Sequence, residues 1–246
     1  MKDKISCICI THQRVSYLEK AIAYFEKQTY PNKELLVIYE HKDRATKKYI
    51  EKQTHFHHLR LAEKGNLSGK QNKVEKLRWE KQKLRRGNTN VYFVEINSAN
   101  PLSLGTKRNL ATKIAEGEYI CIWDDDDIYS KTRLHNQKNF IDFTKKPACT
   151  LANLIIYEES SGRKYLSSQR KEGWEGSLLC KRSEMQTYSD LNKQEDTPVL
   201  ASLMKKNKLS VMEDPELYIY CLHKSNTSGN SHFEKLLSTS EILNSI

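Results

Sequence analysis

Four consecutive aspartates, Asp124–Asp127, directly follow the apolar run Tyr119–Trp123. Adjacent carboxylates repel one another, and a cluster of them at the end of a buried strand is unfavourable unless a cation balances it. Mg²⁺ and Mn²⁺ prefer carboxylate oxygens and keep coordination sites open for water and phosphate. The pattern therefore predicts a divalent metal site at the edge of a hydrophobic core. The structural alternative is a solvated turn whose acids cap a helix.

The segments that must position these acids alternate between strands and helices. Strands are expected at 5–10, 35–39, 91–96 and 119–123, with helices at 16–27 and 104–115. This order predicts a mostly parallel, Rossmann-like sheet with helices on both faces. Such sheets bind ligands at the carboxyl ends of their strands. Polar side chains follow three of these strands, at Thr11–Arg14, Glu40 and Asp124–Asp127.

The second half of the chain has a looser pattern. Helices are expected at 133–143 and 197–206, and strands at 149–157, 174–180, 209–212 and 216–222. We expect a larger half at 1–128, a smaller half at 129–225, and a polar tail over the surface at 226–246.

Composition excludes several classes of protein. The chain has 246 residues, of which 37% are hydrophobic, and no apolar run approaches eighteen residues. We therefore expect a globular protein without a spanning helix or a signal peptide. Its six cysteines form no C-x-x-C pair, and nearly all lie in apolar runs. They are interpreted as reduced core residues of a cytoplasmic protein.

Positive charge is concentrated in one segment. The net charge is +10, and nine Lys or Arg residues lie between Lys64 and Arg86. Within a polar insertion at 42–90, the stretch Ser68–Arg86 is predicted to form one basic helix. A solvated amphipathic helix and attraction to an anionic membrane both fit this pattern. Nucleic-acid binding is not expected, because no recognition motif is present.

Several stretches, taken in order, resemble the motifs of family 2 glycosyltransferases, which have the GT-A fold. They are Ile5–Arg14, Tyr17–Ile22, Gln28–Leu35, Gly105–Ala111, Ala115–Ile120, Trp123–Asp127, Glu195-Asp196 and Tyr220–Asn226. The resemblance covers most of the chain outside the 42–90 insertion. The order of the motifs makes it specific, although each motif alone would be weak.

The resemblance implies an inverting transfer of a hexosyl or N-acetylhexosaminyl group from a nucleotide-diphosphate donor, a UDP-sugar being expected. It also implies Mn²⁺ or Mg²⁺ as cofactor and a carbohydrate or lipid-linked acceptor with a reacting hydroxyl. The expected role is in cell-surface polysaccharide or glycan biosynthesis. The expected location is the cytoplasm, with peripheral contact at the inner face of the membrane through Ser68–Arg86.

Site residues follow from the same resemblance. Asp126 and Asp124 correspond to the D-x-D metal motif, and His223 is a candidate third ligand, although a late histidine is also a common structural residue. Asp196 is predicted to be the catalytic base, with Glu195 second. Asp196 would also make a good helix cap before Thr197-Pro198. The residues expected to bind substrates are Thr11, His12, Arg14, Glu40, Lys107, Arg108, Asp124, Asp125, Trp174 and Glu175.

Two of these assignments depart from the family or have a structural alternative. Glu40 stands where the family shows paired aspartates and a Gly-Ser turn, so the donor nucleotide is not fixed by this position. Trp174 could stack on a sugar ring or anchor the core.

Two other functions remain open at this stage. A nucleotidyltransferase on a related sheet would attack phosphorus, and it generally needs a Gly-rich first loop, which Thr11–Arg14 does not supply. A non-catalytic module could bind anionic membrane or nucleic-acid surfaces through the basic segment alone. Deletion of Ser68–Arg86 distinguishes this second alternative from an enzyme.

Overall fold

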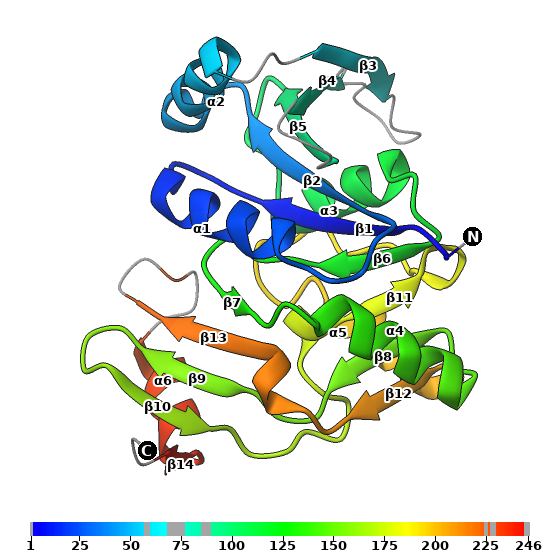
Figure 1. Ribbon diagram of the computed structural model, residues 1–246, viewed down its shortest axis with the longest axis vertical. Coiled ribbons are helices and arrows are strands. Elements are labelled where there is room, and N and C mark those ends of the chain that lie inside the picture. Colours follow the sequence, from blue (N-terminus) through cyan, green and yellow to red (C-terminus); the bar gives the residue numbers. More distant parts are fainter. Residues whose placement is uncertain are drawn as a thin grey trace.

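The computed structural model describes residues 2–56, 60–67, 77–84, 90–223, 226 and 230–243. These residues form two β-sheets, and the smaller one lies at the lower left in Figure 1, beside β8 and β12 of the larger one. The larger sheet has nine strands in the order β12-β8-β11-β6-β1-β2-β5-β4-β3 within the described ranges. The smaller sheet has the order β14-β10-β9-β13-β7.

The centre of the larger sheet consists of four parallel strands. These are β1 (Ile5–Ile10), β2 (Lys33–Glu40), β5 (Val91–Asn97) and β6 (Tyr119–Ile122). β1 pairs with β2 and β6, and β2 pairs with β5. All four are almost completely buried, as expected for apolar strands that are covered on both faces. The four predicted strands are confirmed.

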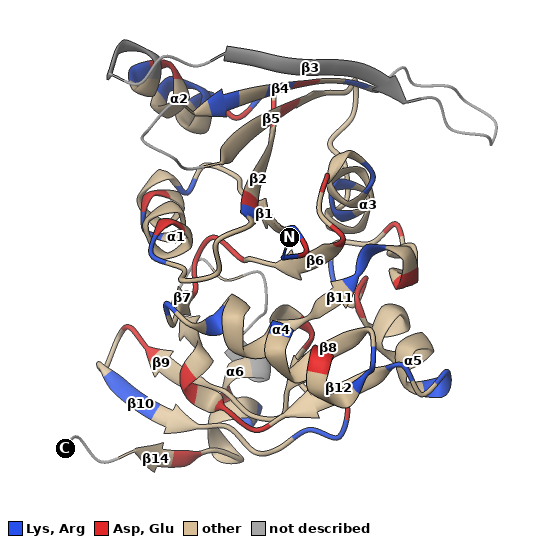
Figure 2. Cartoon of the chain, turned by 45° about the vertical axis from the view of Figure 1, so that its right-hand side comes forward, with Lys and Arg blue, Asp and Glu red and all other residues tan. Residues whose placement is uncertain are grey.

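Helices cover both faces of this centre, as predicted. α1 (Val15–Glu26) and α3 (Leu104–Ile114) lie on opposite sides of the strands in Figure 2. α1 buries one apolar stripe that includes Leu18 and Phe25. α2 (Arg44–Phe56) follows β2 and was not predicted, because its sequence is mostly polar. Asp43 precedes α2 and accepts a hydrogen bond from the backbone N–H of Thr46 at 3.0 Å.

The predicted basic helix at Ser68–Arg86 is wrong for the part that the structure describes. β3 (Arg60–Leu67) and β4 (Leu77–Leu84) form an antiparallel pair that continues the sheet beyond β5. Residues 68–76 and 85–89 lie outside the described residues. The free edge of β5 supplies backbone partners for β4, and these outweigh the helical spacing of the side chains. Lys81 can face inward because its ammonium lies 2.7 Å from Glu116.

Three short strands extend the sheet on the other side of β6. They are β8 (Ala148–Leu151), β11 (Leu179–Lys181) and β12 (Leu209–Met212), accompanied by α4 (Arg133–Thr144) and α5 (Thr197–Lys205). The strand predicted at 149–157 is in fact two strands in different sheets. The strand predicted at 174–180 is a turn of 3₁₀-helix, η1 (Glu175–Ser177), followed by β11. A second 3₁₀ turn, η2 (Arg182–Glu184), follows β11 directly.

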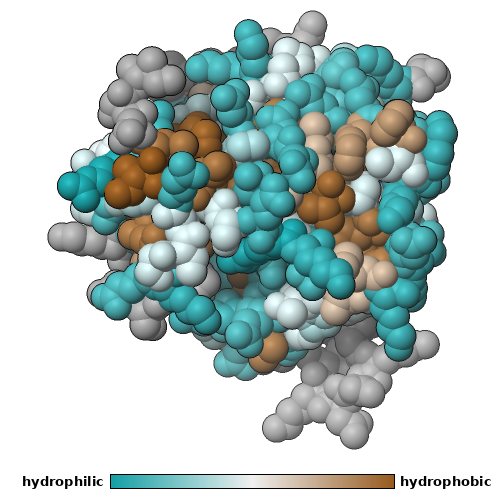
Figure 3. Space-filling view, turned by 90° about the horizontal axis from the view of Figure 1, so that it is seen from below, coloured by the Kyte–Doolittle hydropathy of each residue, from teal (hydrophilic) through white to brown (hydrophobic). Residues whose placement is uncertain are grey.

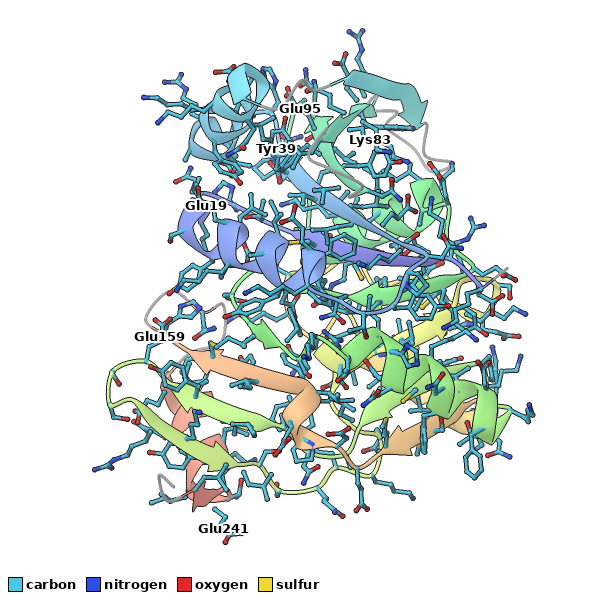
Figure 4. All side chains as sticks on the ribbon, in the orientation of Figure 1. Glu19, Tyr39, Lys83, Glu95, Glu159 and Glu241 are labelled. Atoms are coloured by element: carbon cyan, nitrogen blue, oxygen red, sulfur yellow. The ribbon has the colours of Figure 1, made fainter. Side chains whose placement is uncertain are left out.

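The smaller sheet joins segments that are far apart in the sequence. It contains β7 (Ile128–Tyr129), β9 (Ile155–Glu158), β10 (Arg163–Leu166), β13 (Tyr218–Leu222) and β14 (Glu241–Leu243), with η3 (Pro215–Leu217) leading into β13. Glu159, beyond β9, accepts a hydrogen bond from Tyr17 of α1 at 3.1 Å, which links this sheet to the first helix (Figure 4). The face seen from below is mostly hydrophilic, with hydrophobic side chains in separate groups (Figure 3).

The C-terminal segment was expected to run over the surface as a polar tail. The structure instead shows a helix and a strand that pack against the rest of the chain. α6 (Asn230–Ser238) buries Leu236 in the main core, and β14 pairs with β10. The prediction for the cysteines is confirmed, because all six are buried and free. No helix among the described residues is long and apolar enough to cross a membrane.

Candidate active site

A cavity of about 710 Å³ opens where β1 and β6 end, and the segment before α5 and one end of the smaller sheet complete its wall. Eleven residues predicted from the sequence line it: Thr11, His12, Arg14, Lys107, Arg108, Asp124, Asp126, Trp174, Glu175, Glu195 and Asp196. Three others lie behind the wall: Glu40, Asp125 and His223. The fold therefore brings most of the predicted site together from segments that are far apart in the sequence.

The four aspartates divide into two pairs. Asp124 and Asp126 are partly exposed, whereas Asp125 and Asp127 are buried. Asp124, Asp126 and Asp127 line the cavity, and Asp125 lies behind it. Asp127 accepts hydrogen bonds from the Tyr218 hydroxyl at 2.5 Å and from the Cys221 N–H at 2.8 Å. Burial raises the pKa of Asp127. This carboxylate therefore joins the end of β6 to β13, and its role is structural.

Arg14 lies against the aspartates. Its guanidinium nitrogens are 2.5 Å from Asp126 Oδ2 and 2.7 Å from Asp125 Oδ1. Neither carboxylate oxygen of Asp125 accepts a hydrogen bond of good geometry. Burial, which outweighs the charge of Arg14, raises the pKa of Asp125 to about 7. The negative charge at the end of β6 is therefore incompletely balanced by the protein.

His223 follows β13 and reaches the same cluster. Its Nε2 lies 3.1 Å from Asp126 Oδ2, and its ring stacks on Tyr17 with centroids 4.6 Å apart. Burial by itself would raise the pKa of Asp126, but the hydrogen bond from His223 and the charge of Arg14 lower it. His223 was predicted to be near this carboxylate, and the structure places it there.

A hard divalent cation fits the chemistry of this cluster. Carboxylate oxygens of Asp124 and Asp126 and the imidazole of His223 are donors that Mn²⁺ and Mg²⁺ accept. Burial also raises the pKa of Asp124, so additional positive charge would stabilise the ionised acids. In the described chain, no three His, Cys, Asp or Glu side chains form a ready-made metal centre.

Arg108 connects the aspartates to the predicted base. Its buried guanidinium lies 2.6 Å from Glu195, 3.2 Å from Asp196 and 3.5 Å from Asp124. Lys107 is 2.5 Å from Glu40, which explains how Glu40 can belong to the site without lining the cavity. Both basic residues were predicted to contact a diphosphate, and in the absence of ligand each is paired with carboxylates.

The segment 188–196 is positioned by close contacts with the start of α3. Asp190 accepts hydrogen bonds from the hydroxyls of Ser103 (2.5 Å) and Thr106 (2.8 Å), and the Gly105 N–H donates to the carbonyl of Leu191 at 3.0 Å. A Cβ at Gly105 would lie 1.8 Å from the Ser189 carbonyl oxygen, so only glycine fits there. These contacts fix the position of the segment that ends in Glu195 and Asp196.

Asp196 occupies the N-cap position of α5, but its side chain makes no capping hydrogen bond. Its carboxylate is 25% exposed, whereas that of Glu195 is 4% exposed. Burial raises the pKa of Glu195. The more accessible carboxylate is therefore Asp196.

A third arginine, Arg170, also lines the cavity. Arg170 places its guanidinium carbon 3.4 Å from the centre of the Trp174 indole, and its Nη1 is 3.3 Å from Glu175. Trp174 is only 7% exposed, so Arg170 covers part of the predicted sugar platform. The role of Trp174 in stacking stays a prediction.

Comparison with known proteins supports this fold. Residues 93–207 match the family model described as Glycosyl transferase family 2. TarS 1-349 from S. aureus, in complex with UDP-GlcNAc, is 17% identical with a TM-score of 0.62 over 95% of this chain and 64% of that one. Mannosyltransferase PcManGT from Pyrobaculum calidifontis, in complex with GDP-Man and Mn²⁺, is 12% identical with a TM-score of 0.62 over 97% and 63%.

The family match covers less than half of this chain, and the two solved structures support the fold alone. The fold is GT-A, and the chain spans less than two thirds of the length of those two solved structures. No curated protein sequence matches the chain. The family match contains Arg108, Asp124–Asp127, Glu195 and Asp196, but it begins after β1 and β2.

Several functional neighbours could not be found from the sequence. Arg170 and Tyr218 line the cavity but come from segments without a distinctive pattern. Asn226 also lines it, and it lies in the Tyr220–Asn226 motif but was not predicted to be a site residue. The pairing of Arg14 with Asp126 joins residues 112 positions apart. The sequence did contain one indication of this pairing. Arg14 follows a predicted strand, as the aspartates do, so both are expected at the same edge of a parallel sheet.

Proposed function

We propose that this protein is an inverting, metal-dependent glycosyltransferase. It moves a hexosyl or N-acetylhexosaminyl group from a nucleoside-diphosphate donor to a hydroxyl acceptor. The observation that carries the proposal is the meeting of Asp124 and Asp126 with Glu195 and Asp196 in one cavity, connected through Arg108. UDP-GlcNAc and UDP in the TarS structures favour a UDP-sugar donor, and Mn²⁺ in the PcManGT structure favours a divalent metal.

The donor half of the site lies at the ends of β1 and β6. Asp124 and Asp126 would hold the cation, with His223 as the third donor. When bound, a divalent cation supplies positive charge that stabilises the leaving diphosphate. Thr11 and His12 line the cavity beside β1, where they would contact the nucleotide. Lys107 and Arg108 would turn to the diphosphate from their carboxylate partners.

The acceptor half supplies the base. The acceptor oxygen attacks the anomeric carbon, and the bond from that carbon to the diphosphate oxygen breaks. Its electron pair leaves with the nucleoside diphosphate, while the hydroxyl proton passes to the carboxylate of Asp196. A single displacement of this kind inverts the anomeric configuration. Asp196 is assigned this role because it is more exposed than Glu195.

The biological setting is part of the same proposal. Residues 1–128 are assigned to the donor and 129–225 to a carbohydrate or lipid-linked acceptor, in the biosynthesis of a cell-surface polysaccharide or glycan. The protein would work in the cytoplasm or at the inner membrane face. The proposed contact with anionic lipid would not involve a basic helix at Leu77–Leu84, because these residues form a strand.

Two variants test the assignment of the base. Asp196→Asn should lower transfer by about 10²-fold to 10⁴-fold and leave the affinity for UDP-sugar and Mn²⁺ unchanged, because an amide cannot take the proton. Glu195→Gln should reduce transfer less. Calorimetry measures donor binding, and release of nucleoside diphosphate measures transfer. If Asp196→Asn weakened donor binding without slowing transfer, the assignment would be wrong.

The chemical identity of the products distinguishes a glycosyltransferase from the main alternative, a nucleotidyltransferase. A glycosyltransferase releases a nucleoside diphosphate, whereas a nucleotidyltransferase releases pyrophosphate. Detection of pyrophosphate with sugar phosphate and a nucleoside triphosphate would contradict the proposed reaction.

A further inference from the structure

Arg170 is less completely neutralised than the other paired cations of the cavity wall. Arg14, Lys107 and Arg108 each have a carboxylate oxygen at 2.6 Å or closer. Arg170 has its described carboxylate partner at 3.3 Å, and its side chain is 33% exposed. Within the described ranges, its guanidinium donates no hydrogen bond other than the one to Glu175. An arginine has five N–H donors, so most of them remain available to a ligand.

The guanidinium is held in place before any ligand binds. Its central carbon lies 3.4 Å from the centre of the Trp174 ring, and this cation–π contact holds the guanidinium against the indole. The backbone beneath it is also anchored, because the Arg170 N–H donates to the Ala152 carbonyl at 2.8 Å. Gly173 closes the turn with a φ of 69°, against Thr150 of β8. Arg170 is therefore a pre-organised donor rather than a mobile surface side chain.

Arg170 is also placed on the acceptor side of the cavity. Its partner Glu175 begins η1, and the charge of Asp196 adds to burial in raising the pKa of Glu175. The next residue, Gly176, would bring a Cβ within 3.2 Å of Asp124 Oδ2. One turn of chain thus connects Arg170 with both the proposed base and the cavity-lining aspartates.

We propose that Arg170 binds an anionic group of the acceptor, a carboxylate or a phosphate, and so holds the neighbouring hydroxyl at Asp196. A planar guanidinium suits both groups because it can donate two parallel hydrogen bonds. Glu175 keeps Arg170 partly neutral when the acceptor is absent and competes with the incoming anion. This inference rests on the proposed glycosyltransferase activity and names the class of its acceptor.

The test compares three small acceptor probes that differ in charge: methyl glucoside, methyl glucuronide and methyl glucoside 6-phosphate. Their dissociation constants are measured by NMR titration of the full chain in the presence of Mg²⁺ and UDP. We expect one or both charged probes to bind about tenfold more tightly than the neutral one, because a charge-assisted hydrogen bond is gained. The preferred charged probe distinguishes a carboxylate acceptor from a phosphate acceptor.

Three variants make the result specific. Arg170→Gln should abolish the preference for the charged probes, and Glu175→Gln should increase it by removing the competing carboxylate. Arg163→Gln, at an exposed arginine on β10, is the matched control and should leave the preference unchanged. If Arg170→Gln proves unstable in thermal unfolding, the increase expected for Glu175→Gln still tests the proposal.

The outcomes separate this inference from the proposed function. Equal binding of charged and neutral probes, failure of the charged probes to bind, or an unchanged preference in Glu175→Gln would overturn the acceptor assignment. Binding of UDP is recorded in the same samples. If the unaltered protein bound no UDP with Mg²⁺, the proposed function itself would fail.

Discussion

The two ends of the central strands both carry charged side chains, but they balance them differently. At the end where β1 begins, two acids meet two lysines: Lys4 lies 3.0 Å from Glu34 and 2.6 Å from Glu116, and Lys81 lies 2.7 Å from Glu116. At the end where β6 finishes lie the acids Asp124–Asp127, Glu195 and Asp196. Among the described residues, the arginines paired with them are Arg14 and Arg108. Negative charge is therefore in excess at the cavity end alone.

The pKa values of the acids report this difference. Hydrogen bonds from Lys4 and Lys81 lower the pKa of Glu116 to about 2, so its ionised form is stabilised. Burial raises the pKa of Asp125 to about 7, so its ionised form is destabilised. A balanced cluster stabilises the fold, whereas an unbalanced one would be stabilised by a cationic ligand. We therefore expect substitutions at the balanced end to affect stability, and substitutions at the cavity end to affect the proposed activity as well.

The largest effect is expected for Arg108→Met. Removal of this buried cation leaves Glu195, Asp196 and Asp124 without their shared partner, so the free energy of unfolding should fall by about 3–5 kcal/mol. Transfer should be lost together with stability. Denaturant unfolding measures the first and product release the second. A loss below about 1 kcal/mol would mean that the carboxylates are not buried against Arg108 as described.

Gly105→Ala should have the next largest effect. The added Cβ would lie 1.8 Å from the Ser189 carbonyl oxygen, so the segment that carries Asp196 must move. We expect a loss of about 1–3 kcal/mol in unfolding free energy. Because displacement of a positioned catalytic group is costly, kcat should also fall by roughly tenfold to a hundredfold. Donor affinity, measured by calorimetry, should change little, and a fall in donor affinity alone would contradict this account.

Lys81→Met tests the balanced end with a smaller expected effect. Lys81 lies over the Tyr92 ring at 4.3 Å and pairs with Glu116, which is 46% exposed and keeps Lys4 as a partner. Stability should fall by about 1 kcal/mol, measured by denaturant unfolding. Transfer should be unchanged. An activity loss comparable to that of Arg108→Met would remove the distinction between the two ends.

The smallest effect concerns pH. The pKa of Glu116 is about 2 in the folded protein, below its ordinary value of 4.5. Its contribution to stability is therefore present above about pH 4.5 and is lost as the pH falls toward 2. Glu116→Gln should flatten this part of the stability profile, measured by unfolding at pH 7, 4 and 3. A profile that keeps its full slope in the variant would show that other acids cause it.

The sequence was sufficient to predict the central fold. Apolar runs such as Cys7–Ile10 and Leu35–Tyr39 form strands that are buried on both faces, and their order allows few topologies. Leu77–Leu84 was misassigned because its side chains also fit a helix, and only the neighbouring edge of β5 decides between the two. The division of 149–157 between two sheets likewise depends on partners far away in the sequence.

The sequence predicted most of the residues that line the cavity, but it did not predict which of their side chains form ion pairs with one another. Asp124, Asp126, Glu195 and Asp196 were found because motif position places them near strand and helix ends. Arg108 pairs with three of these acids. This pairing depends on the packing of segment 188–196 against α3, which the sequence does not reveal. Asp127 was indistinguishable by sequence from its neighbours, and burial against Tyr218 gives it a structural role.

The central claim is that the acids beyond β6 bind a cation that in turn binds a diphosphate. Titration calorimetry of UDP into the protein, with and without Mn²⁺, tests it most directly. We expect UDP binding to strengthen about tenfold or more with Mn²⁺ and this gain to disappear in Asp126→Asn, whose fold is retained. Equal UDP affinity with and without Mn²⁺, or an undiminished gain in Asp126→Asn, would contradict the account.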